Sequence, residues 1–251
     1  MNSSNASRLD EATTLLAEYG DRFRKAIAAN SQADDPRAQM IPGGFQFGLV
    51  TTEAVKVLLA THDSFAPHAA TVCRAFYELS IRLLWAVRAA NGWRRLQVYY
   101  ATEDIKWAKQ AQGIAPTASL AAEVLRTRQE VLDRTLSDGS RPTVSPSLEV
   151  MLKDIEDHDI AMGLRCAGGQ AASVDYAYVY RMLCRPAHGH MSVVLSDKPE
   201  GLMLHATTVP LTAALSMVQT SCHAVERDPK REIEAVVQRA LRILTPPPAS
   251  P

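Results

Sequence analysis

Two short segments of the chain gather residues suited to acting on an anion. In the first, Arg74 stands four residues before Glu78. Four residues cover about 400° of an α-helix, so the two side chains lie one turn apart on the same face. This order is the poorer one for a surface ion pair, because glutamate ahead of the cation is favoured. The flanking residues are largely apolar, so we expect both side chains to be partly buried, either as a structural ion pair between helices or as part of a site.

The second segment, residues 176–190, carries Arg181, Arg185 and His188. Arg181 and His188 are separated by about two helical turns, so they fall on one line of a helix. Arginine stays cationic and can hold a phosphate through two hydrogen bonds, while histidine has a pKa of about 6.5 and can move a proton. Pro186 disfavours helical conformation at Arg185, so Arg181 with His188 is the stronger pair. The alternative for this segment is an exposed basic helix end that only complements the helix dipole.

Together, the two segments resemble a family of helical bacterial proteins with an RxxxE helix and a later YxxLSxxxHG helix end. The second motif is matched by Tyr180-x-x-Leu183-Cys184-x-x-x-His188-Gly189, with Cys184 in place of the usual serine. The resemblance spans residues 65–244. The second segment also resembles the R-x4-6-H signature of HEPN domains, at Arg181 to His188 and at Arg185 to His190. Met182 and Pro186 follow these arginines, where that superfamily commonly has a polar residue.

The resemblance implies a fold, an activity and partners. HEPN domains are helical bundles of toxins and phage-defence proteins, and many are ribonucleases that need no metal or cofactor and act as dimers. It implies RNA cleavage by attack of a ribose 2′-hydroxyl on the adjacent phosphate, with RNA or a nucleotide, a second copy and an antitoxin protein as partners. The alternative is a non-catalytic helical interaction or regulatory module that binds a nucleotide, RNA or a protein. Lys plus Arg (27) equals Asp plus Glu (27), which favours this alternative because RNA-binding enzymes usually carry a basic stripe.

The resemblance also implies roles for individual residues. His188 would move the proton, while Arg181, helped by Arg185, would stabilise charge on the phosphoryl oxygens. Glu78 would orient one of these cations, and Arg74 would hold Glu78. The residues expected to contact substrate are Tyr180 and His190.

Composition places the chain in a broad class. Of 251 residues, 47% are hydrophobic and 22% are charged, which excludes disorder over the whole chain. Residues 1–10 lack the apolar run of a secretory signal, and we find no stretch approaching the roughly 20 apolar residues of a membrane span. The four cysteines are scattered without a CxxC pair, so neither a zinc cluster nor a disulfide framework is indicated. We expect a cytoplasmic protein with no membrane partner.

The elements that must position these residues are helices. Helical periodicity dominates and predicts an all-α fold, a single antiparallel helical bundle with one small β-hairpin near 191–206. The hairpin is indicated by two short apolar runs, 191–195 and 202–206, that flank a turn-rich segment. The expected helices cover 7–29, 52–61, 66–91, 93–112, 117–136, 148–158, 173–185, 211–226 and 229–244.

Proline and glycine mark the expected boundaries. Residues 31–48 contain Pro36, Pro42 and Gly43-Gly44 and are predicted to form a connection. Residues 1–50 would then be an N-terminal helix and linker packed on the core, and 51–244 the helical bundle domain. Residues 245–251, which include four prolines, are predicted to be an unstructured tail.

Other polar groups are expected to be structural. The run 156–159 concentrates metal-ligand types, but adjacent helical residues point in different directions, so we expect a solvated helix end. His205 and His223 are isolated in the sequence and are assigned no chemical role. Trp85 and Trp107 occupy positions typical of core residues.

Overall fold

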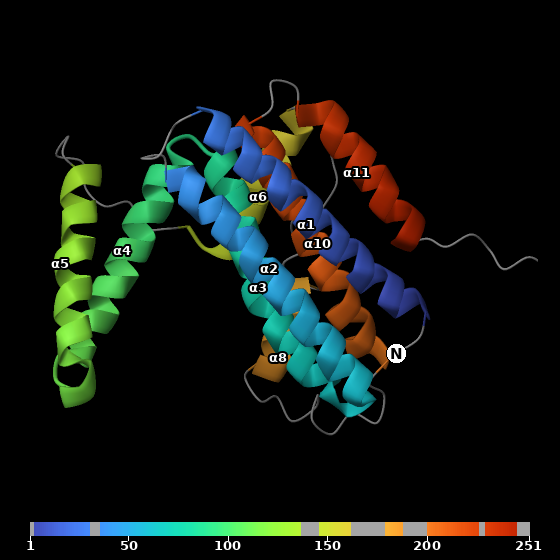
Figure 1. Cartoon of the computed structure of the whole chain (residues 1–251), viewed down its shortest axis with the longest axis horizontal. Helices are drawn as coiled ribbons and strands as arrows, with labels where there is room; N and C mark the ends of the chain where they lie inside the picture. Colours follow the sequence, from blue (N-terminus) through green and yellow to red (C-terminus); the bar gives the residue numbers. More distant parts are fainter. Residues whose placement is uncertain are drawn as a thin grey trace, which may run out of the picture. The chain divides into compact units, whose positions relative to one another are not determined.

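The computed structural model describes residues 3–30, 36–136, 146–161, 179–187, 200–225 and 229–244. Within these ranges the chain is helical apart from short connections, and no strand occurs (Figure 1). The prediction of an all-α helical fold is therefore confirmed. The chain divides into two compact units, one made of Met1–Arg88 with Leu148–Pro251 and the other of Ala89–Ser147.

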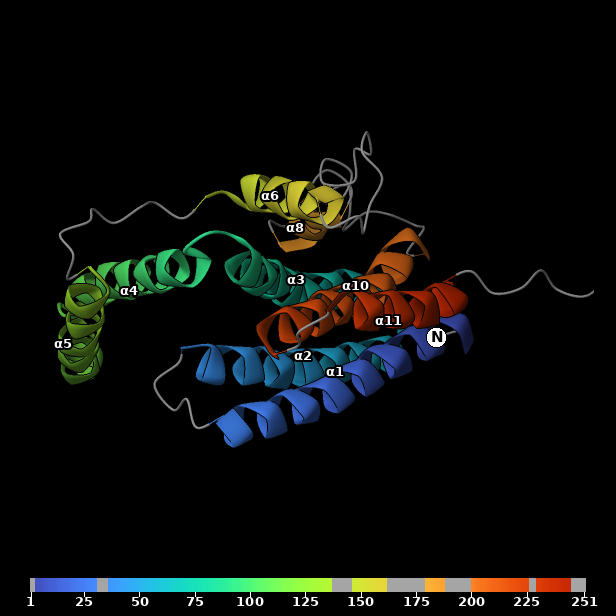
Figure 2. The same ribbon diagram turned by 90° about the horizontal axis from the view of Figure 1, so that it is seen from above.

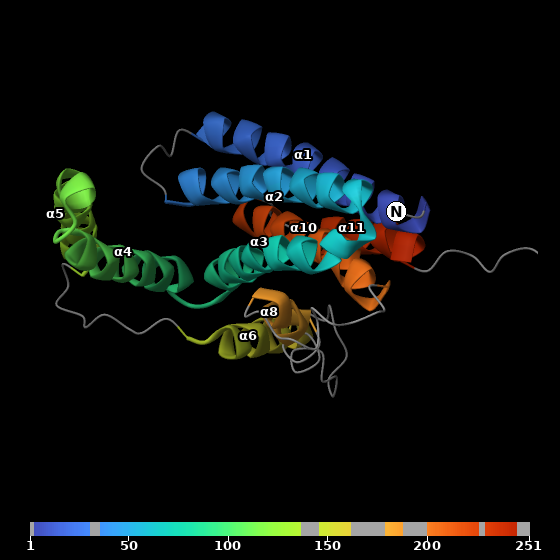
Figure 3. The ribbon, with the colours of Figure 1, turned by 90° about the horizontal axis from the view of Figure 1, so that it is seen from below.

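The larger unit is a layered helical bundle. Its helices are α1 (Ser3–Asn30), α2 (Pro36–Thr61), α3 (Ala66–Arg88), α6 (Leu148–Ala161), α8 (Arg181–Ala187), α10 (Glu200–Val225) and α11 (Pro229–Leu244). In Figure 2, α3 and α10 form the middle layer, with α1 and α2 on one side and α6 and α8 on the other, and Figure 3 shows the same order from below. Helix α11 packs against α10 and α1. Because α3 contacts both outer layers, it is the element that carries side chains to α8.

Helix α2 corrects the prediction of a connection over residues 31–48. From Pro36 onward this segment is helical and continues without interruption through residue 50 to Thr61, with Pro42 inside the helix. Pro36 suits the first helical position because its missing N–H needs no partner there. The predicted linker is therefore wrong for residues 36–48.

The glycines of α2 explain why sequence reasoning failed there. A Cβ on Gly44 would lie 2.7 Å from Leu83 Cδ1, and a Cβ on Gly48 would collide with the Phe76 ring. Both glycines therefore allow α2 to approach α3 closely. Tertiary packing outweighs the helix-breaking tendency that the sequence pattern indicated, which is about 1 kcal/mol for each glycine.

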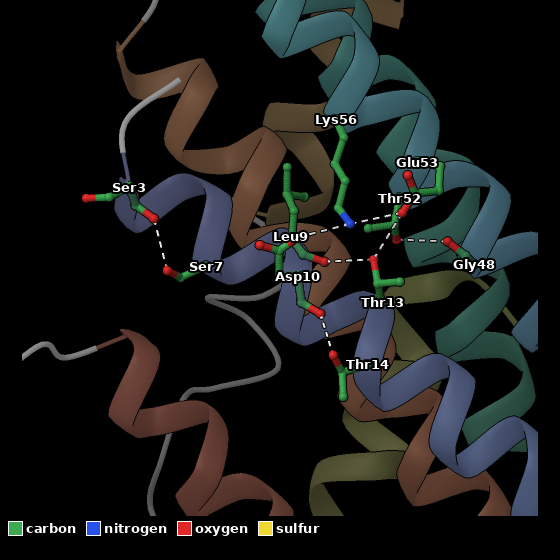
Figure 4. Close-up of polar contacts among 10 residues, drawn as sticks. All are labelled: Ser3, Ser7, Leu9, Asp10, Thr13, Thr14, Gly48, Thr52, Glu53 and Lys56. Atoms are coloured by element: carbon green, nitrogen blue, oxygen red, sulfur yellow. Dashed lines mark hydrogen bonds and ion pairs between the residues drawn. The ribbon is translucent and has the colours of Figure 1, made fainter.

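Polar contacts join α1 to α2 along their outer side (Figure 4). Lys56 Nζ lies 3.1 Å from Asp10 Oδ1 and 2.9 Å from Glu53 Oε1. The Thr13 hydroxyl donates to the carbonyl of Leu9 at 2.9 Å, and its oxygen lies 3.4 Å from Glu53 Oε1. Such exposed ion pairs contribute little stability, about 0–1 kcal/mol each. The buried faces of the two helices therefore do most to hold them together.

Helix α10 corrects the predicted β-hairpin. Its second strand, predicted at 202–206, lies inside this helix, while the first, at 191–195, is outside the described residues. Leu202, Met203, Ala206 and Val209 are all buried, a spacing that continues into the rest of the helix. A short apolar run cannot be assigned to strand or helix by its own period, and here the helical face decided it.

Helix α10 also contains a candidate membrane span. By length and composition, Gly201–Val225 is apolar enough to cross a membrane, and 67% of its most apolar stretch is buried within the structure. The sequence analysis missed this stretch because it divided the segment into a strand and a helix. A core helix satisfies the same criterion, so the finding is weak evidence for a membrane location.

The smaller unit is a helical hairpin of α4 (Gly92–Ala111) and α5 (Ala118–Thr135), joined by a short 3-10 turn, Ala115–Thr117. Its small core consists of Ala108, Ala111 and Ala121 with Val124 and Leu125 against them. At the open end, Arg94 Nε donates to the Thr135 carbonyl at 2.9 Å. Trp107 is exposed, so its predicted core position is wrong, whereas Trp85 of α3 is fully buried.

Candidate functional site

Helix α3 carries a row of three charged residues spaced one helical turn apart. Arg74, Glu78 and Arg82 follow each other at intervals of four, so they share one face. The opposite side of the helix is buried in the bundle and includes Phe76, Leu83 and Leu84. The charged row is only partly buried, as the sequence analysis expected for Arg74 and Glu78.

Glu78 is held by Arg82. Its Oε1 accepts hydrogen bonds from Arg82 Nη2 at 2.7 Å and from Arg82 Nε at 3.2 Å. The side chain of Glu78 is 29% exposed and that of Arg82 is 12% exposed. The expected pairing of Arg74 with Glu78 is not the one formed among the described residues, because Glu78 turns to the cation that follows it. Glutamate four residues ahead of the cation is the favoured order for an ion pair on a helix, so the spacing of Glu78 and Arg82 already indicated this pair.

Arg74 instead reaches the second motif segment. Its guanidinium carbon lies 5.4 Å from the centre of the Tyr180 ring, and its Nη2 donates to the Tyr180 hydroxyl at 3.3 Å. Tyr180 lies in the turn that leads directly into α8, and α8 packs against α3. The structure therefore brings together Arg74, Glu78, Arg82 and Tyr180, which we call the motif cluster.

The surroundings of Arg74 and Tyr180 keep these two groups in defined protonation states. Burial raises the pKa of Tyr180, and the charge of Glu78 adds to this, while Arg74 opposes it. The hydrogen bond to Tyr180 raises the pKa of Arg74, and the nearby Glu78 contributes. At neutral pH the cluster therefore presents a neutral phenol beside a permanent cation.

The remaining predicted residues are placed only in part. Arg181 is exposed at the first position of α8. Arg185 is within the helical backbone of α8, so the expectation that Pro186 removes it from helical conformation is wrong. A proline this close to a helix end costs few hydrogen bonds. His188 and His190 lie outside the described residues.

A second charged group, which the sequence analysis missed, lies at the other end of α3. Arg88 Nη1 is 2.7 Å from Asp159 Oδ1 of α6, with side chains only 2% and 6% exposed. Arg88 Nη2 also donates to Gln219 Oε1 of α10 at 2.8 Å. The rings of His158 and His223 stand edge to face 5.5 Å apart. We call Arg88, Asp159, His158 and His223 the buried cluster.

The buried cluster corrects one expectation, since Asp159 is buried and is not part of a solvated helix end. His223, which was expected to be structural, stands against His158. A signal was present: Asp159 continues the buried face of α6 that runs through Leu148, Met151, Leu152 and Ile155. A charged residue on an apolar stripe must be paired, and its partner could have been sought among the cations of apolar helices such as α3.

Burial sets the charge state of the two histidines. It lowers the pKa of His223 to about 4, and the charges of Arg88 and His158 add to this effect. Burial also lowers the pKa of His158, with Arg88 contributing and Asp159 opposing. Both imidazoles are therefore neutral at neutral pH, and the buried cluster contains one cation and one anion.

Neither cluster is arranged as a metal centre, although the buried cluster contains two histidines and an aspartate. Across the described part of the chain, no group of three or more His, Cys, Asp or Glu side chains is placed to hold a metal ion. Comparisons of the chain with protein-family models, with curated proteins and with solved structures found no match.

Proposed function

We propose that this chain is a HEPN-like protein of the toxin or phage-defence type that binds RNA and cleaves it without a metal. The observation that carries the proposal is the contact of Arg74 with Tyr180. It joins the RxxxE helix to the segment carrying the R-x4-6-H pattern, which the proposed site requires.

The motif cluster supplies groups suited to a phosphodiester. Arg74 is a cation with hydrogen-bond donors beyond the one that Tyr180 accepts, and guanidinium groups hold phosphate oxygens in pairs. The partly buried Tyr180 ring limits the positions that the Arg74 side chain can adopt. RNA bound there must be single-stranded or looped, because only then is its sugar–phosphate backbone flexible enough to react.

In this proposal the proton transfer falls to His188, which follows α8 directly in the sequence. The histidine takes the proton of the 2′-hydroxyl as that oxygen attacks the adjacent phosphorus, and returns a proton to the departing 5′-oxygen. Arg181 and Arg185 stabilise the negative charge that builds on the phosphoryl oxygens. The products would be a 2′,3′-cyclic phosphate and a free 5′-hydroxyl.

A non-catalytic module is the second candidate, favoured by the equal numbers of acidic and basic residues (27 each). Such a protein would bind RNA, a nucleotide or a protein partner through the same surface. The two candidates differ in whether bound RNA is cut.

The test is incubation of the purified chain with labelled single-stranded RNA in the presence of EDTA. We expect cleavage that leaves cyclic phosphate ends, and a loss of about 100-fold or more in His188→Ala. Arg126→Gln is the matched control, because Arg126 is an exposed arginine of α5 paired only at the surface with Glu130. Binding without cleavage would support the non-catalytic module. Cleavage that EDTA abolishes or that His188→Ala retains would overturn the proposed enzyme.

A further inference from the structure

We propose that Glu78 selects ribose over deoxyribose, by accepting a hydrogen bond from a 2′-hydroxyl next to the phosphate that Arg74 holds. The inference rests on the proposed RNA binding and assigns Glu78 a contact with the ligand in place of a purely orienting role. It follows from the hydrogen bonds of the Glu78 carboxylate, which involve only one of its two oxygens.

The two oxygens of Glu78 differ in their partners. Both hydrogen bonds from Arg82 go to Oε1. Among the interactions of the described residues, none engages Oε2, and the carboxylate remains partly exposed. Arg82 thus fixes the orientation of Glu78 while leaving an acceptor for a ligand. An ionised carboxylate only accepts hydrogen bonds, so that ligand must offer an N–H or O–H donor.

The neighbour of this acceptor is a cation with donors to spare. Arg74 lies one turn away on the same face of α3, at a Cβ separation of about 5–6 Å. Its bond to Tyr180 uses Nη2, and among the interactions of the described residues no hydrogen bond engages its Nη1 or Nε. The site therefore presents donors for an anion beside an acceptor for a hydroxyl.

Ribose phosphate matches this arrangement and deoxyribose phosphate does not. In RNA the 2′-hydroxyl is a donor adjacent to the 3′-phosphate, and it is the group by which proteins distinguish RNA from DNA. DNA would place a sugar carbon against Oε2, so the carboxylate would lose water without gaining a donor. Its negative charge would also repel the phosphates with no compensating hydrogen bond.

Arg82 makes this arrangement possible. Its side chain is largely buried, and its charge balances that of Glu78 close to a polyanion. Without Arg82, the carboxylate would be free to rotate toward Arg74 and would compete with the phosphate for that cation. Arg82 is therefore a positioning residue for Glu78.

The experiment compares three single-stranded oligonucleotides of one sequence: RNA, DNA and 2′-O-methyl RNA, which keeps the phosphates but removes the hydroxyl donor. Binding is measured by fluorescence anisotropy on the full chain carrying His188→Ala, so that RNA stays intact. We expect RNA to bind about tenfold more tightly than the other two, as for a hydrogen bond to a charged group.

Variants then assign the preference to Glu78. Glu78→Ala should bring the RNA-to-DNA ratio close to one, because RNA loses the hydrogen bond from its 2′-hydroxyl while DNA is relieved of an uncompensated negative charge. A structural defect would instead weaken both alike. Arg82→Gln should reduce the ratio, and Arg82→Lys should restore part of it. Glu130→Ala, which removes the exposed carboxylate paired with Arg126, is the matched control and should leave the ratio unchanged.

The outcomes separate this inference from the proposed function. If none of the oligonucleotides binds, RNA binding itself is wrong. Equal binding of RNA and DNA to the reference protein would overturn the role of Glu78 and leave nucleic-acid binding standing. An RNA preference that survives Glu78→Ala would also overturn it.

Discussion

The two charged clusters on α3 share one helix and differ in depth. In the buried cluster, the Arg88–Asp159 pair is almost completely removed from solvent and bridges α3 to α6. In the motif cluster, Glu78 and Arg82 belong to the same helix and remain partly exposed. A deeply buried pair cannot lose one member without leaving an unpaired charge, whereas a partly exposed one can exchange a protein partner for water or a ligand. Burial therefore distinguishes the buried cluster, which joins helices of the fold, from the motif cluster, which we propose binds a ligand.

The largest expected effect is at the buried pair. Asp159→Ala leaves the Arg88 guanidinium buried without its counter-ion and should lower the free energy of unfolding by about 3–5 kcal/mol. Urea unfolding followed by circular dichroism measures this. Asp104→Ala is the control, since its pair with Arg128 is exposed and should contribute less than about 1 kcal/mol. Equal losses of unfolding free energy in Asp159→Ala and Asp104→Ala would show that burial does not set the contribution of these ion pairs.

The next effect is the pH dependence of the buried cluster. The pKa of His223 is about 4 in the folded chain and about 6.5 when unfolded, so the unfolded chain binds more protons between these values. This contribution to stability is complete above pH 6.5 or so and is lost as the pH falls toward 4.

Melting temperatures between pH 7.5 and 4.5 test this dependence. His223→Phe should flatten the decline, because the group that takes up the proton on unfolding is gone. His68→Gln, at an exposed histidine of α3, should keep it. A wild-type melting temperature that does not fall over this range would contradict the buried, neutral state of His223.

A smaller effect is expected at Glu78. In Glu78→Gln the amide oxygen can still accept from Arg82, and the site is partly exposed, so unfolding should change by less than about 1 kcal/mol. Urea unfolding in parallel with Asp159→Ala measures the contrast. A loss as large as that of Asp159→Ala would make the motif cluster a second structural core.

The smallest effect is expected for Tyr180→Phe. The ring stays over Arg74, and the hydrogen bond to Arg74 that is lost is long, at 3.3 Å. We therefore expect a loss of about 0.5 kcal/mol, the low end of the usual range for a hydrogen bond. Tyr180→Ala removes the ring as well and should lower the melting temperature further. If the two variants melt alike, the stacking of Arg74 on Tyr180 contributes nothing.

Sequence reasoning succeeded where the information is local. The period of apolar residues predicted α3, α6 and α11 to within a few residues, and the spacing of Arg74 and Glu78 placed both on one partly buried face. It failed at α2, where glycines normally interrupt a helix, and at the start of α10, where a short, mostly apolar run fits the period of a strand and of a helix. In both places the packing surface of another helix decided the outcome.

The candidate site, too, could be predicted from the sequence only in part. The family resemblance implied that the two motif segments meet, but through Glu78 and a cation of the second segment rather than through Arg74 and Tyr180. Arg82, the partner of Glu78, was overlooked although it lies on the same helix. For the buried cluster the sequence offered one sign only, a charged Asp159 on the apolar face of α6, and no pattern named its partners. Arg88 belongs to another helix, and Gln219, which also binds Arg88, is 131 residues from it. No periodicity links residues at that separation.

By itself, the sequence determined the helical class and which residues share a helix face, because both depend on side-chain spacing along one element. Only the tertiary structure decided which charges became buried and paired. Burial depends on the helices that pack around a residue, and a charge becomes structural or available for a ligand according to how much water that packing removes.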